Sequence, residues 1–165
     1  SFPNVVIHRV PRGISVVTPL SACPHCAVPI RPGDNIPVMS WLLLRGRCRS
    51  CAAPIAPRYA IVELATALVF AGLAGLAAPG ILTAASPAAA IAAGLELVAL
   101  LWFAGIGIAL TAIDLDTHRL PDRIVLPSYA VLAALLGAAA LLTGAGEAAA
   151  RAAAGAGILF AFYLA

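Results

Sequence analysis

Long apolar runs that are almost free of charge limit what this chain can fold into. Between Arg58 and Asp114 the only charged residues are Glu63 and Glu96. The whole chain is 62% hydrophobic and 10% charged, with a mean hydropathy of +1.02. Soluble domains contain about 25% charged residues. We therefore expect most of this chain to lie in a lipid bilayer.

Four segments are candidates for membrane-spanning helices, each of which needs about 20 apolar residues. The expected spans run from Tyr59 to about Pro79, from about Ala88 to Ile113, from about Ile124 to Thr143, and from about Ala148 to Ala165, where the last run is incomplete. The sequence therefore predicts an α-helical polytopic membrane protein whose transmembrane domain comprises residues 59–165. About four spans in an up-and-down order are the simplest arrangement.

Positive charge is concentrated before the first expected span and in one later loop. Seven arginines precede residue 59, where Asp34 is the only acid, and the loop from Asp114 to Arg123 contains Arg119 and Arg123. Because Lys and Arg favour the cytoplasmic side of a membrane, both regions are predicted to be cytoplasmic, with residues 80–87 and 144–147 facing outward. The chain has no lysine and its arginines adjoin apolar segments, so we expect no nucleic-acid partner.

Two matched cysteine pairs lie within residues 1–58. The segments Cys23–Cys26 and Cys48–Cys51 both have the pattern C-x-x-C, with 21 residues between them. Similar tails follow, Ala-Val-Pro-Ile after the first pair and Ala-Ala-Pro-Ile after the second. Paired turns of this kind direct four thiolates at one tetrahedral cation, as a structural zinc requires. The predicted zinc ligands are Cys23, Cys26, Cys48 and Cys51.

The predicted zinc site would have a structural role in a small, loop-rich cytoplasmic domain of residues 1–58. A segment of this size gains little stability from apolar burial alone. A metal enclosed by four thiolates has no open position for water or substrate. Two disulfides or a redox-active C-x-x-C pair are alternatives, but the reducing cytoplasm and the two matched turns favour zinc. Arg45, Arg47 and Arg49 are expected to offset the negative charge of the centre.

Asp114 is the acid that the sequence singles out for chemistry. It directly follows Ala112 and Ile113, at the carboxyl end of an expected span. The helix macrodipole and partial desolvation both disfavour a charged carboxylate there. An ionisable residue at such a depth is a functional candidate. Together with a second carboxylate, Asp114 could share a proton and activate water for peptide hydrolysis.

Asp116 and Asp122 are candidates to assist Asp114. We expect Asp116 to be a solvated loop acid. Asp122 follows Pro121 and is expected to cap the next helix. The other intramembrane acids, Glu63 and Glu96, are not expected to meet Asp114.

Several ordered motifs resemble those of the type IV prepilin peptidases. In the N-terminal part they are Asn4–Arg9, Cys23–Cys26, Asp34–Pro37, Ser40–Leu42, Arg45–Cys51, Pro54–Ile55, Arg58–Tyr59 and Val62–Leu64. The segment Ile113–Asp122 is similar to the first aspartate motif of that family. The resemblance covers essentially the whole chain.

This resemblance implies an aspartic endopeptidase of the bacterial inner membrane that removes the short basic leader of type IV prepilins and pseudopilins. Many members also methylate the new amino terminus with S-adenosylmethionine. The first catalytic aspartate of the family matches Asp114. The implied partners are the prepilin substrate and the lipid bilayer.

The second catalytic aspartate of the family lies in a Gly-x-Gly-Asp motif, which does not occur in these 165 residues. We therefore expect the chain to be a fragment that lacks one span at the front and the later spans at the back. The alternatives are a non-catalytic membrane scaffold whose zinc-binding domain docks a cytoplasmic partner, and a redox membrane protein that uses its C-x-x-C pairs.

Overall fold

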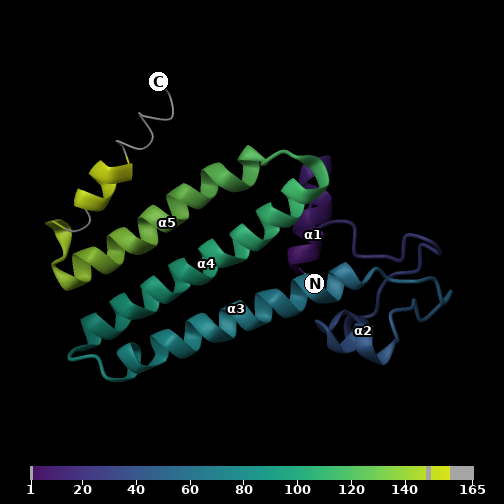
Figure 1. Ribbon diagram of the computed structural model, residues 1–165, viewed down its shortest axis with the longest axis horizontal. Helices are drawn as coiled ribbons and strands as arrows, with labels where there is room; N and C mark the ends of the chain where they lie inside the picture. Colours follow the sequence, from purple (N-terminus) through teal and green to yellow (C-terminus); the bar gives the residue numbers. More distant parts are fainter. Residues whose placement is uncertain (1, 148–149, 157–165) are drawn as a thin grey trace. The chain divides into compact units, whose positions relative to one another are not determined.

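The described part of the chain, residues 2–147 and 150–156 of a computed structural model, consists of helices and loops (Figure 1). The three long helices are α3 (Pro57–Leu82), α4 (Pro87–Thr117) and α5 (Asp122–Thr143). The short elements are α1 (Phe2–Arg9), η1 (Val10–Arg12), η2 (Pro32–Asn35) and α2 (Met39–Leu43). Among these residues no strand forms, and pairing is limited to two isolated β-bridges.

Within residues 2–147 and 150–156, three helices are long and apolar enough to cross a membrane, and they match the first three expected spans. The predicted fold class, a helical polytopic membrane protein with a four-cysteine cluster, is confirmed. The second span was predicted to end at Ile113, but α4 continues to Thr117. It ends where His118 adopts a left-handed φ of 49° and donates its amide N–H to the carbonyl oxygen of Asp114 (2.8 Å). The fourth expected span lies largely outside the described residues.

The long helices expose most of their apolar surface. In the most apolar stretch of each helix, at most 11% of the residues are buried by the protein itself. Continuous apolar surface of this extent is not stable in water. Its natural cover is lipid, as expected for a membrane protein.

Contacts divide the chain into two units, of which one comprises residues 72–103 and 126–165. In this unit the C-terminal part of α3 connects through residues 83–86 to α4. The Ser86 hydroxyl caps α4 by accepting the amide N–H of Ala89 (3.2 Å). Among the described residues of this unit the buried ones are small, namely Ala92, Ala99, Ser128 and Ala139. Small side chains let membrane helices approach closely.

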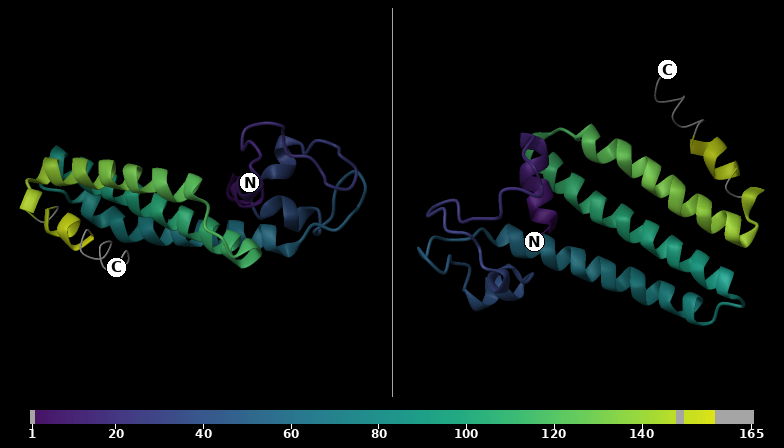
Figure 2. Two further views of the ribbon diagram at one scale, coloured as in Figure 1. Left: turned by 90° about the horizontal axis from the view of Figure 1, so that it is seen from above. Right: turned by 180° about the vertical axis from the view of Figure 1, so that it is seen from behind.

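The other unit comprises residues 1–71 and 104–125 and contains every candidate site residue described below. Its core joins α1, α3 and α4 and consists of Ile7, Val62, Ala109, Ala112 and Ile113. Residues 2–9, for which no helix was expected, form α1 (Figure 1). Figure 2 shows two further views of this unit, in which residues 10–56 form loops and the short helix α2.

Ile113 is the largest side chain that is fully buried among the described residues. We predict that Ile113→Ala lowers the unfolding free energy by about 2–5 kcal/mol, because it removes packed methyl groups and leaves a cavity. The measurement is denaturant unfolding in detergent. Leu115→Ala is the matched control, since the Leu115 side chain is exposed and its truncation leaves no internal cavity. Equal losses for the two variants would contradict the prediction.

Candidate metal centre and acidic segment

The two cysteine turns have the same backbone hydrogen bonds. In each turn the residue after the second cysteine, Ala27 or Ala52, has a φ of 56° and donates its amide N–H to the carbonyl oxygen of the first cysteine (2.9 Å). The amide N–H of that first cysteine in turn donates to the carbonyl oxygen of Val28 (3.0 Å) or Ala53 (2.8 Å). The repeat seen in the sequence is therefore a repeat of structure.

The cysteine turns bring their four thiols together. The Sγ atoms of Cys23, Cys26, Cys48 and Cys51 all lie within 4.8 Å of one another, and those of Cys23 and Cys51 are 3.8 Å apart. In a tetrahedral zinc site, bonds of about 2.3 Å place the sulfurs roughly 3.8 Å apart. These four residues could therefore hold a tetrahedral metal ion without rearrangement of the chain.

The thiols differ in how readily they lose a proton. The backbone amides of Cys26 and His25 stabilise the Cys23 thiolate and lower its pKa to about 6. At Cys51 the Ala53 amide acts in the same direction, but burial and the three neighbouring thiols raise the pKa to about 12. A fourth thiolate is therefore unfavourable among these neighbours, unless a dication neutralises the group.

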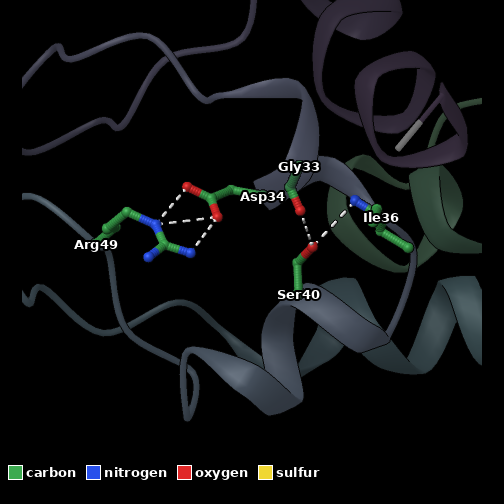
Figure 3. A network of polar contacts seen from close by, with 5 residues as sticks. All are labelled: Gly33, Asp34, Ile36, Ser40 and Arg49. Atoms are coloured by element: carbon green, nitrogen blue, oxygen red, sulfur yellow. Dashed lines mark hydrogen bonds and ion pairs between the residues drawn. The ribbon is translucent and has the colours of Figure 1, made fainter.

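A bidentate ion pair closes the loop beside the second cysteine turn (Figure 3). Arg49 donates from Nη2 to Asp34 Oδ1 (2.6 Å) and from Nε to Asp34 Oδ2 (2.8 Å). The buried Ser40 hydroxyl donates to the carbonyl oxygen of Gly33 (3.1 Å) and accepts the amide N–H of Ile36 (3.0 Å). We expected Arg49 to offset the charge of the metal centre, but its guanidinium binds Asp34.

Trp41 attaches α2 to the chain that follows the second cysteine turn. Its Nε1–H donates to the carbonyl oxygen of Ile55 (3.1 Å). Its ring lies against Gly46, where an added Cβ would approach the ring to 2.9 Å. Gly46 also has a φ of 66°, which favours glycine. A glycine is therefore required there for both conformation and space.

Polar contacts join α1 and the entry to α2 to the first turns of α3. Asn4, which is buried, donates from Nδ2 to the carbonyl oxygen of Tyr59 (3.1 Å) and to Glu63 Oε1 (3.4 Å). Glu63 Oε2 accepts the amide N–H of Val38 (2.7 Å). The same segments line a hollow of about 730 Å³ that includes Cys23, Trp41 and Glu63.

Asp114 lies in the last turns of α4, as predicted, and its side chain is exposed. The packed face of this helix contains Ala109, Ala112 and Ile113. At about 100° per residue, Asp114 lies roughly 200° around the helix from Ala112. Its carboxylate therefore leaves α4 from the face opposite Ala112.

Asp116 is exposed, as expected, but it does not lie in a loop. It belongs to the last turn of α4, and its Oδ1 accepts a hydrogen bond from Arg58 Nη1 (2.5 Å). Arg58 also donates from Nη2 to the carbonyl oxygen of Ala112 (2.7 Å). Sequence reasoning missed Arg58, although the start of one antiparallel helix necessarily lies near the end of the next.

Asp122 is the first residue of α5, where its negative charge suits the helix dipole. The expected side-chain cap is replaced by Pro121, whose carbonyl oxygen accepts the amide N–H groups of Ile124 (2.9 Å) and Val125 (3.2 Å). Asp122 lines an open depression of about 850 Å³ together with Arg119 and Arg123. Asp114 and Asp116 are not among its lining residues, so the three acids do not share one cavity.

The fold and the four-cysteine cluster define a class of membrane protein with a thiol-rich N-terminal domain. Residues 1–76 match the family model for the bacterial peptidase A24 N-terminal domain. The chain is 41% identical over 151 residues to a prepilin leader peptidase/N-methyltransferase of Aeromonas hydrophila, covering 77% of this chain and 47% of the relative. It is 43% identical over 133 residues to one of Klebsiella pneumoniae, covering 77% and 52%.

A third relative is the type 4 prepilin-like proteins leader peptide-processing enzyme of Escherichia coli O78:H11, 41% identical over 140 residues, covering 74% of this chain and 47% of the relative. No solved structure matches the chain. The resemblance to the type IV prepilin peptidases that the motifs indicated is confirmed. It spans about half the length of the curated relatives that it matches.

We predict that Cys48→Ser removes the bound metal and exposes residues 1–56 to proteolysis, because three thiolates and a hydroxyl bind a soft cation far more weakly than four thiolates. The measurements are metal content by elemental analysis and the rate of limited proteolysis. Ser50→Ala, in the same turn but without a ligand atom, is the matched control. Full metal content in Cys48→Ser would contradict the assignment of this cysteine.

The stabilisation that the Asp34–Arg49 pair provides is expected to be constant between about pH 5 and 7. The Arg49 guanidinium holds the pKa of Asp34 below its ordinary value, so the stabilisation is complete above that ordinary value and is lost only as the pH falls through the lower, folded-state value. In metal-loaded protein, Asp34→Asn is expected to reduce amide exchange protection in residues 33–36 by the same factor at every pH between about 5 and 7. Arg31→Gln, which removes a nearby charge but no hydrogen bond, should have a much smaller effect. A protection difference that varies across this range would count against the pair.

Proposed function

We propose that the complete protein is a membrane aspartic endopeptidase that cleaves the leader peptide of type IV prepilins or pseudopilins. The observation that carries this proposal is the 36–43% identity to several relatives named as prepilin leader peptidases over most of the chain. The position of Asp114 at the carboxyl end of α4, with an exposed side chain, supports a role in that reaction.

In the proposed mechanism Asp114 supplies one half of a carboxylate pair, and the Gly-x-Gly-Asp motif of the family supplies the other. Two adjacent carboxylates share one proton, because like charges at close range cannot both ionise easily. The ionised carboxylate takes a proton from water, and the protonated one donates a hydrogen bond to the carbonyl oxygen of the scissile peptide. The exposed face of α4 leaves Asp114 accessible to both the second carboxylate and the substrate. Asp116 and Asp122 are proposed to assist from the same segment.

The N-terminal domain, residues 1–58, is proposed to bind structural Zn²⁺ and to help recognise the polar leader, while residues 59–165 belong to the transmembrane peptidase domain. The sulfur spacing and the all-thiol ligand set support zinc over harder cations. The arginine-rich segments support a cytoplasmic position for this domain and for the Asp114 segment at the bacterial inner membrane. The substrate's apolar helix would then lie against the spans.

Methyl transfer from S-adenosylmethionine to the new amino terminus is part of the proposal. It is supported by the relatives' names, which combine leader peptidase and N-methyltransferase. We assign no residue of this chain to the methyl donor.

We predict that Asp114→Asn in the complete protein abolishes leader cleavage and leaves zinc content unchanged, since the amide cannot take a proton from water. The measurement is the cleavage of a purified prepilin in lipid nanodiscs. Glu96→Gln is the matched control, because it makes the same change of carboxylate to amide elsewhere on α4. Cleavage by Asp114→Asn at the rate of the parent would refute the assignment.

A further inference from the structure

The end of α4 is electrostatically unfavourable on its own. Its last turn contains no basic residue, while Asp114 and Asp116 place two acids at the negative end of the helix dipole. The last carbonyl groups of a helix also have no N–H donor further along the same helix, and here the amide N–H of His118 donates to the carbonyl oxygen of Asp114 (2.8 Å). The two acids at this end are stabilised by positive charge that another element supplies.

Arg58, in the first turn of α3, supplies this charge and two hydrogen bonds. Its Nη1 donates to Asp116 Oδ1 (2.5 Å) and its Nη2 to the carbonyl oxygen of Ala112 (2.7 Å). These two acceptors are four residues apart and therefore lie on one face of α4, one above the other. A planar guanidinium can bind two acceptors at once in a fixed geometry.

This two-point contact determines the orientation of the helix end. Rotation of the last turns about the helix axis would break at least one of the two bonds. Asp114 lies between the two acceptors in sequence but on the opposite side of the helix, about 200° from Ala112. The direction in which its carboxylate points is therefore coupled to the Arg58 contact.

We propose that Arg58 is a positioning residue, which holds the end of α4 so that Asp114 leaves the helix in the direction required for hydrolysis. This inference rests on the proposed function, because it assigns Arg58 a role in that reaction. Arg58 touches neither the substrate nor the reacting water. Its contribution passes through the orientation of Asp114, and errors of about 1 Å in such a group reduce rates by about 100-fold.

The test uses the complete protein in lipid nanodiscs with a purified prepilin. The variants are Arg58→Gln, which removes both bonds, Arg58→Lys, which keeps the charge without the planar fork, and Asp116→Asn, which removes the ionic contact only. Arg151→Gln is the matched control, because Arg151 forms an exposed ion pair with Glu147, four residues earlier in the sequence (3.8 Å). Two quantities are measured per zinc-loaded, folded enzyme: kcat and KM for leader cleavage, and amide hydrogen exchange of residues 114–118.

We expect Arg58→Gln to lower kcat by about 10-fold or more with KM unchanged, and to accelerate exchange in residues 114–118. Arg58→Lys and Asp116→Asn should have smaller effects, and the order of the kcat losses should follow the order of the exchange rates. Arg151→Gln should match the parent in both measurements. A merely structural role would reduce the amount of folded enzyme without changing kcat.

An unchanged kcat for folded Arg58→Gln would overturn the inference, as would a loss of kcat with unchanged exchange in residues 114–118. If Arg58→Gln fails to fold, Arg58→Lys decides by the same two criteria. Asp114→Asn, measured alongside, separates the two proposals. If that variant still cleaves the leader, the proposed role of Asp114 fails, whereas a failure of the Arg58 inference leaves Asp114→Asn inactive.

Discussion

Four thiols that meet at one point hold together a domain that buries very little. Among residues 2–56 the buried positions are Asn4, Ile7, Cys23, Ser40 and Gly46. So small a core contributes little hydrophobic stabilisation, and the ordering of some fifty residues costs about 1–2 kcal/mol for each backbone residue. The loops of this domain therefore depend on the cysteine cluster and on the polar contacts around it. The Arg49–Asp34 pair and the packing of Trp41 on Gly46 have defined positions only if the two cysteine turns are joined.

The same unit shows how a polar domain is attached to membrane helices without a large apolar interface. Asn4 and Glu63 bind backbone groups of other segments, at Tyr59 and Val38 respectively. Arg58, on the neighbouring turn of α3, binds the end of α4. The first two turns of α3 thus provide contacts for both the N-terminal domain and the Asp114 segment. Disorder in the domain would be transmitted to the end of α4 through these turns.

The sequence predicted the large elements well because their signals are physical and local. Apolar run length predicted α3, α4 and α5, and the spacing of the cysteines predicted the cluster that the structure contains. The helical form of residues 2–9 was not predicted, since the run around Ile7 is too short to show a period and its Asn4 contacts are to distant residues. The ion pair of Asp116 was not predicted, for a related reason. The Asp116 carboxylate binds Arg58, 58 positions earlier in the chain, and only the antiparallel order of α3 and α4 brings these two residues together.

The matching hydrogen bonds of the two cysteine turns affect how the metal stabilises the protein. Each turn is shaped by its own backbone, with the left-handed residue Ala27 or Ala52 completing it. A cation that binds both turns acts as a cross-link between two preformed halves. Part of its binding free energy offsets the entropy lost when the 21-residue segment between them is closed, a cost that grows only slowly with length. Insertions in that segment should therefore be tolerated far better than any change of length within a cysteine turn.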